Sequence, residues 1–323
     1  MTSRPSTRQR RNPLQILVAF LAALLLPLAL TGAALASAHH ESHPRTWTVQ
    51  VGNESHDQAI QGMSFLPANI YINAHDTIRW RANSAEIHTV SFLAKGQTLA
   101  STQPFDPTNP AELLKQGGNW YDGKSYYNSG VLTNVSNSGF PAVRSYSLSF
   151  AKTGNFTYWC LVHGMAMKGT VHVRAAGTDY PYSQSQYNRA SQKQAGKILR
   201  DGYHLWHETA EDATNHRVFQ GNDDGVAMVM RFIRSTVHVH VGQTVTFKNT
   251  GMGAPHTVTF GTEPSNLFPP LGDPTNYSGG QLNSGIQPPG ASFAVTFTKA
   301  GTYSYICGLH DFMGMVGKVV VSG

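Results

Sequence analysis

Cysteine is scarce in this sequence, because only two of the 323 residues are cysteines, Cys160 and Cys307. Several disulfides are therefore excluded, and one bridge between the two cysteines is the simplest use of them. Neither cysteine lies near the apolar run at the N-terminal end, which argues against lipid attachment there. Each cysteine is followed three residues later by a histidine and then by methionines. A disulfide requires neither the histidine nor the methionines, so the pattern favours metal ligands over a disulfide bridge.

Charged residues are also few, at 13% of the sequence, with a formal net charge of +6. Four arginines precede an apolar run, 14–36, and the sequence then reaches Ala36-Ser37-Ala38. This arrangement predicts a secretory signal peptide, 1–38, and hence a protein in the periplasm or on the extracellular face of the cytoplasmic membrane. Loss of the four arginines leaves a charge of about +2, which excludes a nucleic-acid partner. If the run were retained, it would be nearly long enough to anchor the chain in a membrane.

Long helical patterns are rare as well. Short runs that alternate apolar and polar residues are separated by segments rich in Gly, Pro, Asn and Ser, which predicts β-strands joined by loops. Two such stretches, 45–175 and 226–323, are each long enough for a core of their own. The polar interval 176–225 has few β-branched residues and predicts a linker with one or two helical turns. We therefore expect an all-β protein with two domains in tandem.

The two stretches repeat one another. Each contains a Lys-x-Gly turn that leads through an aromatic strand to Cys-x-x-His, and each has the same shorter motifs upstream. Two copies about 150 residues apart are domains rather than solenoid repeats, because each copy can form its own core. The matched motifs are His-Thr-Val from His88 and from His256, Asn-Ser-Gly at 128–130 and 283–285, and Cys-x-x-His at 160–163 and 307–310.

Each copy offers two histidines, a cysteine and a methionine as candidate metal ligands. Imidazole with thiolate and thioether sulfur favours copper, and trigonal His2Cys coordination with a weak axial Met is typical of blue-copper electron-transfer sites. Thiolate ligation argues against calcium or magnesium, and a weak thioether ligand argues against structural zinc. The candidates are His88, Cys160 and His163 with Met165 or Met167 in the first copy, and His256, Cys307 and His310 with Met313 or Met315 in the second.

Both halves resemble the cupredoxins, the plastocyanin, amicyanin and pseudoazurin group of small blue-copper proteins. Cys307-x2-His310-x4-Met315 followed by Val-Gly-Lys-Val is similar to the plastocyanin loop. The resemblance implies a Greek-key β-sandwich and one type 1 copper ion in each domain. It also implies that electrons pass through the exposed edges of His163 and His310 to redox proteins of an extracytoplasmic electron-transport chain.

The axial methionine is open in both halves. Met313 stands at the shorter, amicyanin-like distance from its histidine and competes with Met315. In the first half, alignment on the Gly-x-Val that follows the loop favours Met167, with Met165 as its rival. Met167 stands one residue closer to its histidine than Met315 does, which is where the first half departs from the family pattern.

Two other functions compete with an electron carrier. A two-domain copper oxidoreductase that resembles nitrite reductases or small laccases would join blue copper to catalytic copper through a histidine beside the cysteine. Copper storage or delivery would fit the histidines within 39–43, but such sites rarely need a trigonal set closed by thiolate. The sequence predicts a carrier and not an enzyme, because no histidine adjoins either cysteine. The flanking residues are Trp159, Leu161, Ile306 and Gly308.

The remaining histidines carry no metal prediction. His238-Val-His240 alternates on an expected strand, so both imidazoles should lie on one exposed face. His204, His207 and His216 fall in or next to the expected helical turns and are predicted to be surface or packing residues.

Overall fold

The computed structural model describes residues 43–323, all of which belong to one compact unit. The predicted signal peptide, 1–38, lies outside the described residues. Within the part of the chain that is described, no helix is long and apolar enough to cross a membrane.

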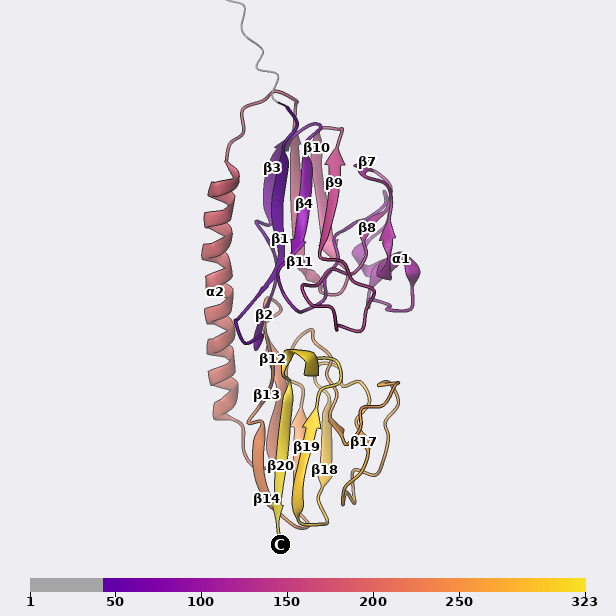
Figure 1. The fold of residues 1–323 in the computed structure, drawn as a ribbon, viewed down its shortest axis with the longest axis vertical. Helices are drawn as coiled ribbons and strands as arrows, with labels where there is room; N and C mark the ends of the chain where they lie inside the picture. The colour runs from indigo at the N-terminus through magenta and orange to yellow at the C-terminus, as the bar shows by residue number, and fades with distance from the viewer. Residues whose placement is uncertain (1–42) are drawn as a thin grey trace, which may run out of the picture. The chain divides into compact units, whose positions relative to one another are not determined.

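The first half is a β-sandwich made of two layers of strands (Figure 1). One layer contains, in order, β2 (Ile60–Leu66), β1 (Thr46–Glu54), β4 (Thr77–Ala82), β9 (Ser145–Phe150) and β7 (Trp120–Tyr121). The other contains β3 (Asn69–Asn73), β11 (Gly164–Arg174), β10 (Gly154–Cys160), β5 (Ser91–Phe92), β8 (Tyr127–Ser129) and β6 (Lys115–Gln116). The long loop between β5 and β9 also holds a 3-10 turn, η1 (Leu99–Thr102), and the short helix α1 (Pro110–Leu113).

The second half is another β-sandwich. Its first layer contains β13 (Ala227–Ile233), β12 (Arg217–Asp223), β15 (Thr244–Lys248) and β18 (Ser292–Thr296). Its second layer contains β14 (Thr236–His240), β20 (Val316–Ser322), β19 (Gly301–Ile306), β16 (Thr259–Phe260) and β17 (Leu282–Asn283). A 3-10 turn, η2 (Asp311–Met313), precedes β20. The predicted all-β fold of two tandem sandwiches is confirmed.

One sheet runs through both halves. β2 of the first half pairs antiparallel with β13 of the second, from Ala227 opposite Gly62 to Val229 opposite Ile60. This pairing makes a continuous nine-stranded sheet out of the first layers of the two sandwiches. The two halves are therefore joined by backbone hydrogen bonds as well as by the chain between them.

Matched aromatic pairs lie at the centre of the two cores. Trp80 packs against Tyr158 with ring centroids 5.3 Å apart, and Phe247 packs against Tyr305 at 5.0 Å. All four side chains are fully buried. Because Tyr158 and Tyr305 each stand two residues before a cysteine, this packing fixes the strands that carry the two cysteines.

The helix α2 (Gln184–Glu211) is much longer than the one or two turns that the sequence predicts. It begins with a capping box formed by Ser183 and Gln186, and it lies against β1, β2, β12 and β13 (Figure 1). Its buried residues recur at alternating steps of four and seven, which forms one stripe along the helix. Most of these residues are small or polar, so the stripe is faint in the sequence. They are Tyr187, Ser191, Ile198, Gly202 and Thr209.

The interval predicted to be a linker also contains a strand of the second sandwich. β12 pairs with β13 and β15 within the nine-stranded sheet. Its sequence, Arg-Val-Phe-Gln-Gly-Asn-Asp, is short and interrupted by Gly221, where the pairing register shifts. A bulge of this kind breaks the alternation by which a strand is predicted.

Candidate metal centres

The first cluster of potential ligands joins two segments of the first sandwich that are distant in the sequence. His88 lies between β4 and β5 and is held by a backbone bridge to Leu132. Cys160 ends β10, and His163 lies in the turn that leads into β11. The structure thus brings together the three residues that the sequence predicts as the trigonal set.

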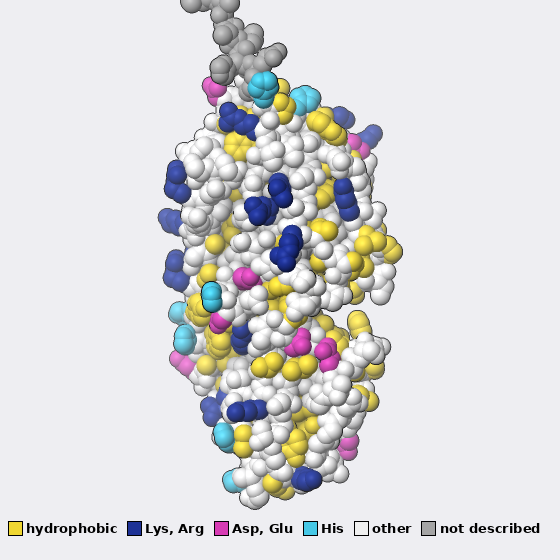
Figure 2. Space-filling view, in the orientation of Figure 1, with side chains coloured by type: hydrophobic (Ala, Val, Ile, Leu, Met, Phe, Trp, Pro, Cys, Tyr) yellow, Lys and Arg dark blue, Asp and Glu magenta, His cyan; other side chains and the backbone are white. Residues whose placement is uncertain are grey.

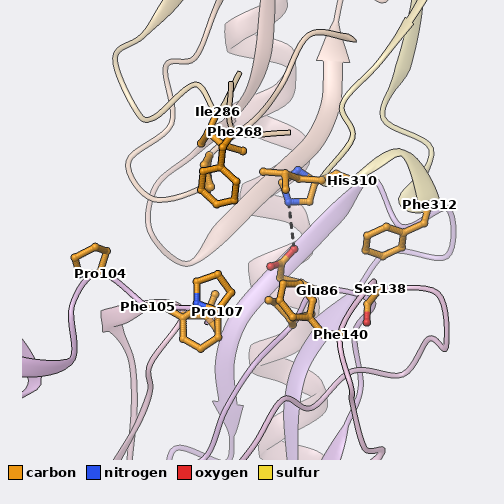
Figure 3. Close-up of a pocket in the computed structure, with 14 residues that line it drawn as sticks. Glu86, Pro104, Phe105, Pro107, Ser138, Phe140, Phe268, Ile286, His310 and Phe312 are labelled. Atoms are coloured by element: carbon orange, nitrogen blue, oxygen red, sulfur yellow. Dashed lines mark ion pairs between the residues drawn. The ribbon is translucent and has the colours of Figure 1, made fainter. Parts of the chain in front are cut away.

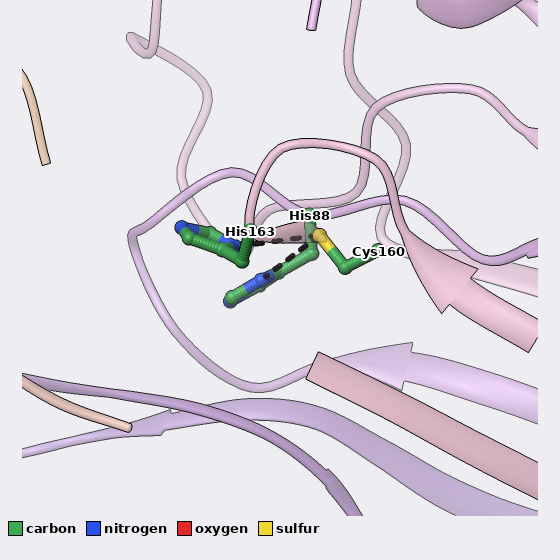
Figure 4. A group of neighbouring side chains, drawn as sticks. All are labelled: His88, Cys160 and His163. Atoms are coloured by element: carbon green, nitrogen blue, oxygen red, sulfur yellow. Dashed lines mark hydrogen bonds between the residues drawn. The ribbon is translucent and has the colours of Figure 1, made fainter. Parts of the chain in front are cut away.

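Figure 4 shows both imidazoles directed at the sulfur of Cys160. The Cys160 Sγ atom lies 3.3 Å from Nδ1 of His163 and 3.9 Å from Nδ1 of His88. The two imidazole rings have centroids 4.9 Å apart. The three donor atoms therefore surround a common point.

The second cluster has the same form. The Cys307 Sγ atom lies 3.7 Å from Nδ1 of His256 and 3.5 Å from Nδ1 of His310. The two Nδ1 atoms are 3.1 Å apart, and the ring centroids are 5.0 Å apart. His256, like its counterpart upstream, precedes a short inner strand, and Cys307 directly follows β19.

A threonine after each upstream histidine holds the cysteine. The backbone N–H of Thr89 donates to Cys160 Sγ at 3.4 Å, and that of Thr257 donates to Cys307 Sγ at 3.4 Å. The threonine hydroxyl oxygens accept from the residue after each cysteine, both at 2.8 Å. Hydrogen bonds to the sulfur and to the residue after it fix the thiol in place and tune a bound metal.

The upstream histidines are seated against two glycines. Gly52 and Gly221 have φ of +72° and +69°, and each lies at a bulge in β1 or β12. A Cβ atom at Gly52 would stand 2.5 Å from Nε2 of His88, and one at Gly221 would stand 3.3 Å from Nε2 of His256. Glycine is required here both for the backbone conformation and for the close approach of the imidazole.

Burial controls the protonation of both clusters. Desolvation lowers the pKa of His163 to about 3 and that of His310 to about 4, and it lowers the pKa of the two upstream histidines well below its usual value. The imidazoles are therefore neutral near pH 7, as metal ligands must be. Burial also raises the pKa of both thiols to about 11, although backbone N–H groups act in the opposite direction. A bound cation would offset this cost, because it stabilises the thiolate.

The donor set and its dimensions fit a copper ion. Within each cluster the ligand atoms all lie within 4.8 Å of one another. Metal–nitrogen bonds of about 2.0–2.1 Å and metal–sulfur bonds of about 2.3 Å place donors of one ion roughly 3–4 Å apart. Two neutral imidazoles with a thiolate match the preference of copper for nitrogen and sulfur.

The methionines differ sharply in burial. Met167 is 1% exposed and lies in the same buried cluster as Cys160, whereas Met165 is 70% exposed. Met315 is fully buried in the cluster that contains Cys307, and its carbonyl accepts from the N–H of Cys307 at 3.0 Å. Met313 is buried too, but it packs with the core of the first half.

The loop histidines are less accessible than the sequence predicts. The side chains of His163 and His310 are only 7% and 8% exposed, since the two sandwiches meet at the loops that carry them. The carboxylate of Glu86 lies between the two imidazoles, 3.8 Å from Nε2 of each. The imidazole edges that the sequence predicts to be exposed are therefore largely covered, because the two halves pack against each other.

Part of the long loop after β5 covers this region. Gln103 donates from Nε2 to the carbonyl oxygen of Leu161 at 2.6 Å, which ties the loop to the residue after Cys160. A cavity of about 430 Å³ beside Glu86 and His310 is lined by aromatic and aliphatic side chains from both halves (Figure 3). The molecular surface is hollowed where the halves meet (Figure 2). The loop thus shields the first cluster and helps to form the cavity.

Other residues singled out in the sequence lie outside the clusters. Cys160 and Cys307 are both free and buried, so the alternative of a disulfide between them is wrong. His238 and His240 are exposed on one face of β14, as predicted. The histidines at 204, 207 and 216 are exposed as well. Of the terminal group, His39 and His40 lie outside the described residues and His43 is exposed.

Several residues that matter to the clusters were not singled out from the sequence, among them the two bulge glycines, two threonines and Glu86. Thr89 and Thr257 had a visible signal, because the His-Thr-Val motif occurs in both halves. Glu86 had none: the residue at its position in the second half is Ala254, and its role depends on how the two halves meet.

Comparison with known proteins finds a matching family and similar copper proteins. A family model described as copper binding proteins of the plastocyanin/azurin family matches residues 52–174 and 220–322. Plastocyanin of Mercurialis perennis is 36% identical over 107 residues, which are 32% of this chain and 98% of the plastocyanin. Plastocyanin of Lactuca sativa is 37% identical over 105 residues, with the same shares covered. A copper(I) structure of an amicyanin mutant is 31% identical, with a TM-score of 0.24, over 35% of this chain and 89% of amicyanin.

The two matched segments cover most of the chain, and each contains one complete His2Cys cluster. The chain therefore belongs to the plastocyanin/azurin family of copper-binding proteins, with one cupredoxin domain in each half.

Proposed function

We propose that this protein is an exported electron carrier with two type 1 copper sites, one in each cupredoxin domain. The observation that carries the proposal is the repetition of one buried His2Cys cluster, built from the same motifs, in both halves. The ligands would be His88, Cys160, His163 and Met167 in the first domain and His256, Cys307, His310 and Met315 in the second.

Burial supports the choice of axial ligands. A methionine that contributes to a buried copper site must reach the cluster from within the protein. Met167 and Met315 share buried clusters with the cysteines, whereas Met165 is largely exposed and Met313 packs with the opposite half. A long, weak axial methionine is one of the features that set the potential of such sites.

The chain's own residues keep the sites rigid. The upstream histidine lies against a bulge glycine. Two hydrogen bonds that involve a threonine hold the cysteine, and the aromatic core pair fixes the strand that carries it. Bound copper would supply a couple that gains or loses one electron. Rigid ligands suit that chemistry, because little rearrangement accompanies the change in charge.

The resemblance to plastocyanins supports redox proteins as partners, and the predicted signal peptide supports a location outside the cytoplasm. The same features favour a carrier over a copper oxidoreductase, because neither cysteine has an adjacent histidine through which a catalytic copper could be joined.

The proposal is tested by metal analysis with absorption and EPR spectra of the purified protein. We expect two copper ions per chain and an intense visible band from thiolate-to-copper charge transfer. Cys160→Ala and Cys307→Ala should each remove one copper and part of the band, and the double variant should be colourless. If Cys160→Ala leaves the colour unchanged, the first site is not blue copper.

The axial assignments have matched controls. Met167→Leu should shift the reduction potential of the first site, whereas Met165→Leu should leave it unchanged because that side chain points to solvent. The opposite result would assign Met165 instead. Reduction of nitrite or oxygen at enzymatic rates by the copper-loaded protein would reject the carrier in favour of an oxidoreductase.

A further inference from the structure

Glu86 is the one acidic side chain that faces both clusters among the described residues. It lies two residues before His88 in the first domain, and its side chain is 8% exposed. Its Oε1 atom lies 3.8 Å from Nε2 of His163, and its Oε2 atom lies 3.8 Å from Nε2 of His310. One carboxylate thus contacts a histidine of each site through a separate oxygen.

The orientation of the two imidazoles explains why this contact matters for metal binding. In His163 and His310 the Nδ1 atom faces the cysteine sulfur, so the Nε2 atom faces Glu86. A neutral imidazole whose Nδ1 atom is a metal ligand carries its proton on Nε2. A ligand histidine usually has a partner such as a carboxylate at this nitrogen, and that partner fixes the tautomer and the ring orientation. Here the two sites share one such partner.

The surroundings leave the carboxylate few other partners. The adjoining cavity is lined largely by apolar side chains, including Phe105, Phe140 and Phe312, and no lysine or arginine lines it (Figure 3). At 3.8 Å the contacts are electrostatic and slightly longer than hydrogen bonds. Because both imidazoles are neutral, each contact joins the Glu86 side chain to an N–H dipole, and such an interaction is stronger in an apolar environment than in water.

The second domain contributes His310 to the arrangement but no carboxylate of its own. Its own residue at the position of Glu86 is Ala254, which packs with the core of the first half. The shared carboxylate therefore exists only when the two domains are docked. The pairing of β2 with β13 and the packing of Met313 on the first core hold that docking in place.

We propose that Glu86 is a positioning residue for both copper sites and that the route from His163 through Glu86 to His310 carries electrons between them within the chain. The proposal rests on the proposed function, because it requires copper in both sites. In the exchange, the reduced site loses one electron and the oxidised site gains it, while no bond forms or breaks and no proton moves. A partner then needs access to only one site, which suits two loop histidines that are almost covered.

The positioning role is tested without copper. In the metal-free protein, nitrogen-15 NMR should show His163 and His310 predominantly as the tautomer protonated at Nε2. Glu86→Leu should shift both histidines toward a mixture of tautomers, and Glu86→Gln, which keeps an acceptor oxygen, should have a smaller effect. Unchanged tautomers in Glu86→Leu would overturn the positioning role. If Glu86→Leu does not fold, Glu86→Gln decides the positioning role alone. The amide nitrogen of the glutamine is a donor, so it opposes an Nε2–H group where Glu86 had an oxygen.

The electron route is tested by rapid partial reduction of the copper-loaded protein, followed by redistribution between the sites. A Met167→Leu background separates the two potentials. We expect redistribution at a rate independent of protein concentration, slowed at least tenfold by Glu86→Leu, and unaffected by Glu208→Gln, which alters an exposed carboxylate on α2. A rate proportional to protein concentration, or an equal rate in Glu86→Leu, would overturn the route.

Copper content separates the two proposals. If either site fails to bind copper in the unaltered protein, the proposed function fails. If both sites bind copper but electrons redistribute equally fast in the unaltered protein and in Glu86→Leu, only the role of Glu86 fails.

Discussion

At the scale of single residues, each His2Cys cluster depends on small side chains that are not potential ligands. The threonines of the two His-Thr-Val motifs supply both a backbone donor to sulfur and a hydroxyl acceptor for the next residue. The two bulge glycines leave room for the upstream imidazoles. The ligands would have the same identity without these residues but would not have the same geometry.

Gly221→Ala should destabilise the protein and weaken copper binding in the second domain. The new Cβ atom would stand 2.3 Å from the carbonyl oxygen of Val229 and would also crowd His256. A left-handed conformation costs an alanine about 1–2 kcal/mol, and overpacking adds about 1–3 kcal/mol. Urea unfolding of the metal-free protein and copper titration measure the two effects.

Gly242→Ala is the matched control. Gly242 also has a positive φ, +85°, but nothing lies within 4 Å of its Cβ position. It should therefore show only the conformational cost, with copper affinity unchanged. Equal losses in the two variants would contradict a steric role for Gly221.

The metal-free protein should lose stability as the pH falls below neutrality. Burial lowers the pKa of His310 from 6.5 to about 4 and that of His163 to about 3. The unfolded chain then binds more protons than the folded one between pH 6.5 and 4, so the free energy of unfolding falls as pH decreases through that window. Each histidine contributes at most about 1.4 kcal/mol per pH unit.

Glu86 changes the free energy of unfolding with pH in the opposite direction. Burial raises its pKa from 4.5 to about 7, so its contribution to stability is present below pH 4.5 and is lost as the pH rises through 7. Urea unfolding at a series of pH values should therefore show a steeper loss toward low pH in Glu86→Gln. His238→Gln, which alters an exposed imidazole, should reproduce the unaltered profile, and a flat profile in Glu86→Gln would contradict these shifts.

At the scale of elements, α2 is the feature that the sequence conceals. Its buried stripe contains small and polar residues, so the helix contributes little apolar surface and its pattern resembles a linker. These small residues allow the helix to approach the sheet closely. At Gly202, a Cβ atom would stand 2.3 Å from Cγ2 of Ile60.

Two glycines of α2 should respond to alanine in opposite ways. Alanine is favoured over glycine in helices by about 1 kcal/mol, and at Gly196 the nearest atom is 3.5 Å away, in the side chain of Arg200. Gly196→Ala should therefore stabilise the protein. Gly202→Ala should destabilise it, because the clash with Ile60 outweighs the gain in helix propensity. Urea unfolding tests both, and stabilisation by Gly202→Ala would show that the helix is not closely packed there.

At the scale of the whole molecule, the two domains share a sheet and part of a core. β2 pairs with β13, and the core cluster of the first half includes Met228, Met230 and Met313 of the second. Tandem domains often unfold separately. These contacts should instead make the metal-free protein unfold in one transition.

Tryptophan fluorescence can test this coupling. The five tryptophans lie in the first half and in α2, so residues 217–323 have none. Trp206 of α2 packs on strands β12 and β13 of the second half, so the test is made in a Trp206→Phe background. Phe247→Ala removes a fully buried side chain of the second core, which should cost about 3–5 kcal/mol. We expect this variant to lower the midpoint of the tryptophan transition, as Phe65→Ala in the first core also should. An unchanged midpoint in Phe247→Ala would show that the domains unfold independently.

The sequence by itself determined the repeat, the all-β fold and the members of both His2Cys sets. These follow from local information: alternation along strands, motifs that occur twice, and the coordination preferences of thiolate and imidazole. It also ranked Met315 above Met313 and Met167 above Met165, a choice that burial supports but that remains a prediction.

Tertiary structure alone decided how the two domains are combined. The long helix, the strand β12 within the expected linker, and the pairing of β2 with β13 depend on contacts between distant segments. The cover over His163 and His310 and the position of Glu86 between them also depend on that docking. A sequence repeat describes what each domain shares with the other, whereas Glu86 has no counterpart, so its role appears only where the two surfaces meet.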